Sequence, residues 1–422
     1  MAQNLLCGID VGSSKMSCII ARVSEEEPTP RVMGFSSVPS RGVKRGQIVD
    51  INQVSSSLEQ AIEQAERMAG AKVTSAFASV GGPHIESINS QGVVAVSHPD
   101  VEISDDDVSR VIDAAKAISL SSTREVIEVS PREYIVDGQG GIKNPLGMSG
   151  VRLEVNTHII TASMTNLKNL ERCMSDLGIE IRGYVFSGLS SALATMSETE
   201  KELGAVLVDL GGGKIDIAVY IEGALTHSSS IPIGARHITN DIAVGLRVSL
   251  DSAEHIKLML SDSAKLKYLK DKKDDVDISG LRLKEGLNSF SYKTVVDGII
   301  RPRLEEMFEQ VLVALDTNEC MNLVPSGLII TGGGALSVGA LEIAKRVIGL
   351  PARIGAPQHI TGLTDEVMYP QYACVAGLLL YAKDTDASEK QLNVKDFDRI
   401  LRNISMKGSV KKVRDLFKNF VP

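Results

Sequence analysis

CGIDVGSSK, at residues 7–15, reads as a copy of LVDLGGGK at residues 207–214. Each stretch is an apolar run that ends in aspartate and a tight glycine-rich turn, and a second apolar run follows it (Met16 to Ala21 and Ile215 to Ile221). This pattern predicts a strand, a turn of phosphate size and a returning strand. Because the hairpin occurs in both halves of the chain, it predicts two lobes that close around one polyphosphate.

The composition excludes several classes of protein. With 422 residues, 43% hydrophobic content and a net charge of −8, we expect a soluble globular protein of several compact units without general affinity for nucleic acid. The five cysteines lack CxxC spacing, which disfavours a disulfide framework or a zinc site and favours a reducing cytoplasm. The longest apolar runs fall far short of the ~20 residues of a membrane span, and no signal peptide is expected at the N-terminus.

The glycine turns are suited to a nucleotide. Backbone amides reach phosphate oxygens only where no side chain obstructs them, which favours the turns at residues 12–14 and 211–213. Because bare carboxylates repel phosphate, we expect Asp10 and Asp209 to hold a hydrated Mg²⁺ between them, with Lys15 as an added cation. A third cluster, Gly332-Gly333-Gly334, follows an apolar strand and leaves room for adenosine. Each cluster alone is also typical of a tight hairpin or a helix-entry turn, and the three together favour a nucleotide.

Short strands that alternate with helices predict α/β lobes with mixed sheets. Apolar spacing and a Ser104 cap predict helices at Val54 to Met68, after Ser104, at Thr165 to Leu177, Ile238 to Ser263, Val295 to Leu315 and Cys374 to Tyr381. The fourth of these helices places Glu254 and Lys257 one turn apart. Such a pair is typical of a solvated ion pair, and near an adenosine site it is also suited to hold ribose or base.

The three glycine clusters, in this order, resemble those of the superfamily that contains actin, sugar kinases and heat-shock ATPases. A closer resemblance, over residues 4–422, is to the FtsA family of bacterial division proteins. It rests on SVGGPHI at 79–85, PREYIVDG at 131–138, NPLGMSGVRLE at 144–154 and AEHIK at 253–257.

The resemblance implies an actin-like, two-lobed α/β fold of duplicated mixed-sheet domains, with an FtsA-type inserted subdomain and a C-terminal amphipathic helix. The implied boundaries are 1–83 and 161–203 for the first-lobe core, 84–160 for the insert, 204–235 and 306–383 for the second-lobe core, 236–305 for its small subdomain, 384–409 for a linker, and 410–422 for a membrane-targeting helix.

The resemblance also implies a site for ATP and Mg²⁺. Its first phosphate loop comprises Asp10, Gly12, Ser13, Ser14 and Lys15, and its second comprises Asp209, Gly211, Gly212 and Gly213. Glu254 and Lys257 approach the nucleoside, and Gly332, Gly333, Gly334 and Ala335 lie under the adenine. Asp10 and Asp209 are the implied metal ligands.

Two positions depart from the superfamily pattern. Lys214 stands where the second loop usually carries a small hydroxyl residue; it either adds a cation to the terminal phosphate or points to solvent. Ser187 stands at the strand-to-helix junction where related ATPases often carry Gln or Glu to set the attacking water. Because serine is a poor general base, we expect at most slow ATP hydrolysis and no small-molecule kinase activity.

The end of the chain favours a membrane-surface helix. Its apolar residues recur at helical spacing and its basic residues occupy much of the remainder: Val413, Leu416, Phe417 and Phe420, with Lys411, Lys412, Arg414 and Lys418. From the pattern alone, a terminal helix docked on the protein's own body or a disordered end remain alternatives. In the FtsA family this helix targets the membrane.

The resemblance places a partner surface in residues 236–305. FtsA proteins use this region to hold the C-terminal tail peptide of FtsZ, the tubulin-like ring protein, and Arg301 and Arg303 match the basic contact. Arginine suits acidic side chains through its planar fork. The alternative is a solvated helix start with Pro302 in its first turn and Glu305 and Glu306 nearby.

The implied function is that of an ATP-loaded protein that polymerises on the inner membrane face at the division septum, bound peripherally through anionic lipids. It would anchor FtsZ filaments and recruit later division proteins. A sugar or acid kinase and a chaperone ATPase are the other readings. A kinase needs a substrate-specific base and an additional small-molecule cleft, and a chaperone needs a peptide-binding domain after the ATPase lobes. The sequence shows neither. A filament protein such as MreB would lack both the insert at 84–160 and the tail.

Overall fold

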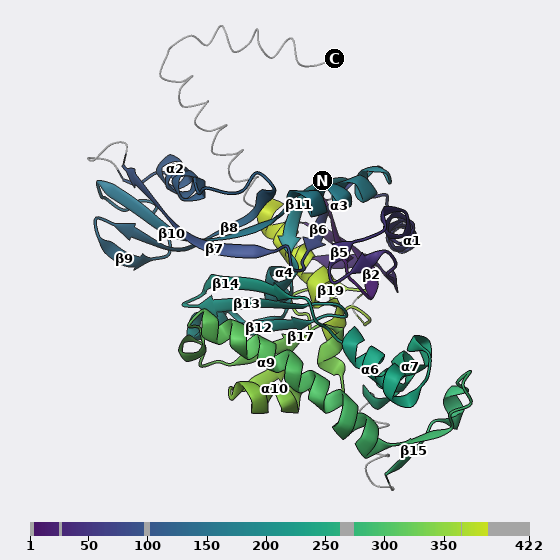
Figure 1. The fold of residues 1–422 in the computed structure, drawn as a ribbon. Coiled ribbons are helices and arrows are strands. Elements are labelled where there is room, and N and C mark those ends of the chain that lie inside the picture. Colours follow the sequence, from purple (N-terminus) through teal and green to yellow (C-terminus); the bar gives the residue numbers. More distant parts are fainter. Residues whose placement is uncertain (1–3, 25–27, 97–101, 262–273, 364, 387–422) are drawn as a thin grey trace, which may run out of the picture.

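The computed structural model describes residues 4–24, 28–96, 102–261, 274–363 and 365–386. Two mixed sheets form its two lobes (Figure 1). The first sheet, in the order β11-β6-β1-β2-β3-β19, consists of β1 (Asn4–Val11), β2 (Lys15–Val23), β3 (Arg31–Pro39), β6 (Ser75–Val80), β11 (Glu180–Phe186) and β19 (Thr361–Gly362). The second, in the order β14-β13-β12-β17-β18, consists of β12 (Ala205–Leu210), β13 (Ile215–Ile221), β14 (Ala224–Ile231), β17 (Leu328–Thr331) and β18 (Ala352–Ile354).

The two sheets share one topology. β1 pairs antiparallel with β2 and parallel with β6, and β12 pairs antiparallel with β13 and parallel with β17. β3 and β14 extend the two hairpins, while β11 and β18 extend the two parallel pairs. The predicted duplication of mixed-sheet lobes is therefore confirmed.

The two hairpins also share one register. Asp10 faces Ser17 across the first hairpin, and Asp209 faces Asp216 across the second. The pairs that close the turns are Val11 with Met16 and Leu210 with Ile215. It follows that Asp10, Gly12 and Lys15 occupy the same positions as Asp209, Gly211 and Lys214.

Amphipathic helices cover the first sheet. α1 (Ile51–Ala69) buries the apolar face that its spacing predicts, capped by Asp50 at its start and by Gly70 in the left-handed conformation at its end. Its apolar face packs on β2 and β3. The other helices of this lobe are α3 (Met164–Ser175), α4 (Ser187–Thr195) and α5 (Glu198–Leu203), and the hairpin β4 (Val43–Lys44) with β5 (Gln47–Ile48) precedes α1.

The insert is a separate sheet with its own small core (Figure 1). Its order is β7-β10-β8-β9, with β7 (Glu86–Ala95), β8 (Arg124–Val136), β9 (Gln139–Ile142), β10 (Arg152–Ser163) and the covering helix α2 (Asp105–Lys116). Ser104 caps α2 in a capping box with Asp107, so the helix predicted after Ser104 is confirmed. The insert contacts the second lobe along β14, where Ser87 Oγ donates to the Ser228 carbonyl at 2.7 Å.

The second lobe carries its helices on one face and at one end of its sheet (Figure 1). They are α6 (Arg236–Leu246), α7 (Leu250–Ser261), the π-helix η2 (Lys293–Ile300), α9 (Arg301–Thr317) and α10 (Ala340–Ile348), with the small hairpin β15 (Asp275–Asp277) and β16 (Ser289–Ser291). The described residues also form four short 3₁₀ turns: η1 (Ser279–Leu281), η3 (Met321–Leu323), η4 (Gly333–Leu336) and η5 (Pro370–Tyr372).

Two predicted helices of this lobe are wrong in detail. The helix predicted from Ile238 to Ser263 is two helices, because Arg247 adopts a left-handed conformation with φ 54° and ends α6. The helix predicted from Val295 to Leu315 begins earlier, as the π-helix η2, and continues directly into α9.

Residues 373–386 form a helix that packs between β1 and α4 of the first lobe. A Cβ on Gly377 would lie 1.7 Å from the Ser190 carbonyl oxygen, and a Cβ on Gly8 would lie 2.8 Å from Leu378 Cβ. Such approaches require glycine. The helix predicted at Cys374 to Tyr381 is thus present and longer, since residues 384–386, assigned to the linker from sequence, are helical. The rest of the linker and the tail at 410–422 lie outside the described residues.

Within the described ranges, no helix combines the length and the apolar character that crossing a membrane requires. All five cysteines are free and buried.

Candidate functional site

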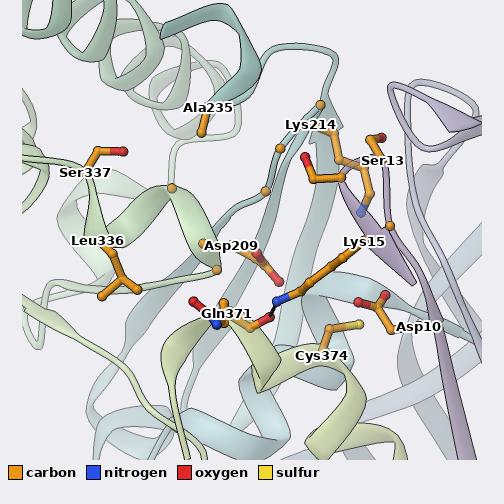
Figure 2. A pocket seen from close by; sticks show the side chains of 18 of the residues that line it. Asp10, Ser13, Lys15, Asp209, Lys214, Ala235, Leu336, Ser337, Gln371 and Cys374 are labelled. Carbon is orange, nitrogen blue, oxygen red and sulfur yellow. Dashed lines mark hydrogen bonds between the residues drawn. The ribbon is translucent and has the colours of Figure 1, made fainter. Parts of the chain in front are cut away.

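A cavity of about 510 Å³ lies where the two hairpins meet (Figure 2). Both phosphate-loop candidates, both nucleoside candidates and the third glycine cluster line it. Of the residues predicted for the nucleotide site, those on the wall are Asp10, Gly12, Ser13, Ser14, Lys15, Asp209, Gly211, Gly212, Gly213, Lys214, Glu254, Lys257, Gly332, Gly333 and Gly334. The structure therefore brings residues from distant parts of the chain to one space.

The first loop is held from the neighbouring strand β6. Ser79 Oγ donates to Asp10 Oδ1 at 2.7 Å and accepts from the Val11 amide at 3.1 Å. A Cβ on Gly12 would lie 2.6 Å from the Lys15 carbonyl oxygen, so this tight turn requires glycine. Ser13 Oγ accepts from the Gly46 amide at 2.9 Å, which fixes the turn against the chain that follows β4.

The second loop carries a strongly buried carboxylate. Ser191 Oγ in α4 donates to Asp209 Oδ2 at 2.5 Å. Burial, reinforced by the neighbouring Asp216 carboxylate, raises the pKa of Asp209 to about 6 despite the opposing effect of Lys214. A bound cation would relieve this repulsion, because it favours the ionised form.

The two loops contact each other directly. A Cβ on Gly212 would lie 1.9 Å from Ser14 Oγ, so only glycine permits this approach. Arg236, at the start of α6, donates from Nη1 to the Ser13 carbonyl at 3.1 Å. The two loops are thereby held against each other at the cavity wall.

The two lysines of the loops lie in different surroundings. Lys15 Nζ donates to the Gln371 carbonyl at 2.5 Å (Figure 2). It also lies 3.8 Å from the centre of the Tyr372 ring. Burial lowers its pKa to about 8, although the charges of Asp10 and Asp209 oppose the shift. Lys214 Nζ forms an ion pair with Asp216 and donates to Ser187 Oγ at 3.0 Å. Lys214 is buried at the cavity wall, so it does not point to solvent.

The third glycine cluster forms the opposite wall. Gly332 has φ 83°, and a Cβ there would lie 2.3 Å from Asp209 Oδ1. Ala335 does not line the cavity, contrary to the prediction. The 3₁₀ turn η4 buries its methyl group in the core of the second lobe, and Leu336 and Ser337 face the cavity in its place.

Glu254 and Lys257 form a bonded cluster with Thr239 instead of a solvated pair. Lys257 Nζ lies 2.7 Å from Glu254 Oε2 and 2.9 Å from Thr239 Oγ1, and Thr239 donates to the same carboxylate oxygen at 2.5 Å. The lysine side chain is 10% exposed and the glutamate side chain 40%. The glutamate therefore keeps acceptor capacity toward the cavity.

Several lining residues were not predicted. Asp216 comes two residues after Lys214, and the strand register places it opposite Asp209. The others come from segments without a motif: Ala235, Leu258, Ser261, Leu336, Ser337, Tyr369, Gln371 and Cys374. Ser187, which the sequence singled out for turnover, also lies on the wall, and its hydroxyl donates to the Val80 carbonyl at 3.0 Å.

The predicted partner arginines make intramolecular ion pairs. Arg303 forms a two-point contact with Asp241 of α6, at 2.6 and 3.2 Å, and also pairs with Glu306. Arg301 contacts Asp297 at 2.9 Å and Glu342 at 3.4 Å. Both arginines stand at the start of α9, with Pro302 in its first turn as the alternative expected, but η2 leads directly into this helix and the two side chains are paired.

The residues predicted for membrane contact, at 411–420, lie outside the described residues.

Solved structures of related shape define the class of protein. The fold is similar to that of a PilM-PilN type IV pilus biogenesis complex, with 14% identity, a TM-score of 0.62, and coverage of 89% of this chain and 98% of the other. It is also similar to MreB 5 of Spiroplasma citri bound to AMPPNP, with 12% identity, a TM-score of 0.53, and coverage of 92% and 98%. This chain has the actin-like two-lobed fold.

Sequence comparisons identify the family. The model of the SHS2 domain inserted in FtsA matches residues 82–161, and that of cell division protein FtsA matches residues 206–377. Cell division protein FtsA of Pseudomonas aeruginosa is 36% identical over 390 residues, covering 92% of each chain. FtsA of Bacillus subtilis is 35% identical over 406 residues, covering 96% of this chain and 90% of its own. The chain belongs to the FtsA family of cell division proteins.

Proposed function

We propose that the chain binds ATP with Mg²⁺ and acts in cell division as an ATP-loaded, membrane-attached filament protein. The observation that carries the proposal is the meeting of Asp10 and Asp209, from equivalent positions of two hairpins, in one cavity of about 510 Å³. That volume falls within the range typical of small-molecule sites. Its glycine-lined turns leave backbone amides free for phosphate oxygens.

The donor set fits a hydrated magnesium ion. Mg²⁺ keeps several waters and takes only one or two protein carboxylates when it binds with phosphates. Asp10 and Asp209 offer that number, and no group of three or more His, Cys, Asp or Glu suited to a metal occurs in the described part of the chain. When bound, the ion would screen the phosphate charges, while Ser79 and Ser191 hold the two carboxylates in place.

The far end of the cavity fits a nucleoside. The turn at residues 332–334 presents backbone without side chains, on which a flat base can lie. Glu254, held by Lys257 and Thr239, provides acceptors for ribose hydroxyls. Leu258 and Leu336 add apolar walls.

A protein of similar fold supports nucleotide binding, and membership of the FtsA family supports the rest of the proposal. MreB 5 of Spiroplasma citri, which shares the fold, has been solved with AMPPNP and with ADP. We propose that the helix at 410–422 attaches the protein to anionic lipid on the inner face of the membrane, and that residues 236–305 hold the FtsZ tail peptide. A single short helix gives weak anchoring, so polymerisation would strengthen attachment through avidity.

Electron microscopy on lipid monolayers tests this function. Full-length protein on an anionic monolayer should form ordered filaments with ATP, and the FtsZ tail peptide should co-localise with them. A variant lacking residues 410–422 should bind nucleotide normally but leave the monolayer bare. If the shortened variant coats the monolayer as densely as the full chain, the assigned anchor is wrong.

A further inference from the structure

The equivalent lysines of the two hairpins have different partners across the hairpin. Opposite Asp10 stands Ser17, so Lys15 has no carboxylate beside it on its own strand. Opposite Asp209 stands Asp216, and this carboxylate forms the ion pair with Lys214. Burial alone lowers the pKa of Lys214, but the charges of Asp216 and Asp209 outweigh it, and the net shift is upward. Lys214 is therefore a charged group on the cavity wall.

The Lys214 side chain also contacts the other lobe. It belongs to the second-lobe hairpin, yet Ser187, which accepts its hydrogen bond, begins α4 in the first lobe. A Cβ on Gly81, at the end of β6, would lie 2.2 Å from the ammonium nitrogen. The ammonium thus occupies the space between the lobes, on the wall of the cavity (Figure 2).

The two lysines contact different parts of the cavity wall. The ammonium of Lys15 reaches the Gln371 carbonyl, and Gln371 lies beside Gly333 in the turn proposed for the nucleoside. Lys214 lies instead against Gly81 and Ser187 of the first lobe. A polyphosphate that extends from a nucleoside at residues 332–334 toward the first lobe would bring its terminal phosphate to Lys214.

The carboxylate that pairs with Lys214 has one oxygen to spare, which a purely structural ion pair would not leave. Asp216 is 1% exposed, and its Oδ1 has no hydrogen-bond partner. Buried carboxylate oxygens are nearly always paired, because an unpaired one loses its water without compensation. Asp216 lines the cavity, so a donor carried in with a ligand, such as a water of a hydrated cation, would satisfy it.

We propose, building on the ATP site proposed above, that Lys214 contacts the terminal phosphate and makes the cavity select ATP over ADP. Asp216 holds the ammonium in place while that phosphate is absent and shares it when the phosphate arrives. An extra charged phosphoryl group offers Lys214 a charge-assisted contact that a diphosphate cannot make. Removal of the lysine charge should then cost affinity for ATP far more than for ADP.

Calorimetric titration of the full chain with MgATP and with MgADP tests this assignment. Lys214→Met should weaken ATP binding at least about tenfold, which corresponds to about 1.4 kcal/mol, and ADP binding less than about threefold. Asp216→Asn should leave ATP affinity equal to wild type or tighter, because it frees the ammonium. The double variant, which removes both charges and leaves none unpaired, should behave like Lys214→Met.

Two results would overturn the inference. One is an equal loss of ATP and ADP affinity in Lys214→Met and in the double variant. The other is an equal loss of ATP affinity in Lys214→Met and Asp216→Asn, which a purely structural ion pair requires. If the wild-type protein binds neither nucleotide, the proposed ATP site itself is refuted. If it binds ATP and ADP with equal affinity, only the role of Lys214 is refuted.

Discussion

Ser191 donates a hydrogen bond to Asp209 across the two lobes, with 2.5 Å between Oγ and Oδ2. The serine belongs to α4 of the first lobe and the aspartate to β12 of the second. Asp10, the equivalent carboxylate, is held by Ser79 of its own lobe. The position of the second carboxylate thus depends on how the lobes are placed, which links the geometry of the site to the closure of the lobes.

Asp209→Asn should stabilise the metal-free protein at pH 7. The folded state raises the pKa of Asp209 from 3.8 to about 6, so ionisation is disfavoured by folding. At pH below both pKa values the effect is absent; as pH rises between them, the unfolded chain ionises first and the free energy of unfolding falls. Above pH 6 the free energy of unfolding of the wild-type protein is lower by about 3 kcal/mol because of this ionisation, and the asparagine variant does not show this decrease.

Urea unfolding of both proteins from pH 4 to pH 7, with a chelator present, measures this difference. Asp113→Asn is the control, because Asp113 is an exposed carboxylate that pairs with Lys116 on α2, and it should change stability by less than about 0.5 kcal/mol. A difference between wild type and Asp209→Asn that stays constant with pH would refute the assigned pKa.

Gly212→Ala should disrupt the contact between the two loops. The new methyl group would lie 1.9 Å from Ser14 Oγ and 2.9 Å from Ser14 Cβ. Crowding of this kind typically costs about 1–3 kcal/mol, so ATP affinity should fall about tenfold or more.

A second substitution distinguishes this clash from a general loss of folding. Ser14→Gly in the same chain removes the clashing atoms and should restore part of the affinity. Gly280→Ala is a matched control, since a Cβ there meets no atom within 4 Å. If Gly212→Ala binds ATP as wild type does, the loops are not in contact in solution.

Asp241→Asn should strengthen binding of the FtsZ tail peptide, by about threefold. Asp241 occupies the guanidinium of Arg303, so an acidic peptide must compete with it for the same planar fork. Arg303→Gln should weaken peptide binding about tenfold. Fluorescence anisotropy with a peptide from the same organism's FtsZ provides both values.

The alternative role for Arg303 is to fasten α9 to α6. In that case Asp241→Asn and Arg303→Gln would lower stability alike, and neither would change peptide affinity. Arg67→Gln, on α1 of the first lobe, serves as a control for removal of an exposed arginine.

Wild-type protein should release phosphate from ATP slowly, at least about a hundredfold below the ~1 s⁻¹ of ordinary slow enzymes. Ser187, at the junction of β11 and α4, donates to the Val80 carbonyl and accepts from the Lys214 ammonium, and a neutral hydroxyl bound to a cation is a very weak base for a proton of water. A coupled phosphate assay measures the rate. Brisk release that Asp10→Ala abolishes would contradict this expectation.

The sequence predicted the features that depend on short patterns. The matched aspartate, glycine and lysine positions revealed both hairpins, since a turn this tight restricts which residues it accepts. Ser104 likewise predicted the start of α2 through its capping chemistry. These signals are local, so they can be read without knowledge of the packing.

What the sequence missed depends on packing between distant segments. Arg247 ends α6 in a left-handed conformation, and no sequence signal marks this end because the residue is not glycine. A signal for the next helix was present, since Ser249 Oγ accepts from the Ser252 amide at the start of α7. The resemblance to the family implied that Ala335 lies under the adenine, but the direction of η4 turns its side chain into the core. Gln371 and Cys374 reach the site only because the helix at 373–386 packs against α4.

Calorimetric titration of wild type, Asp10→Ala and Asp209→Ala with ATP, with and without Mg²⁺, tests the central claim most directly. The account predicts one nucleotide per chain, magnesium-dependent affinity, and a loss of at least about tenfold for each substitution on its own. Binding that is unchanged when either aspartate is replaced, or that ignores magnesium, would show that the two hairpins do not share one metal–nucleotide site.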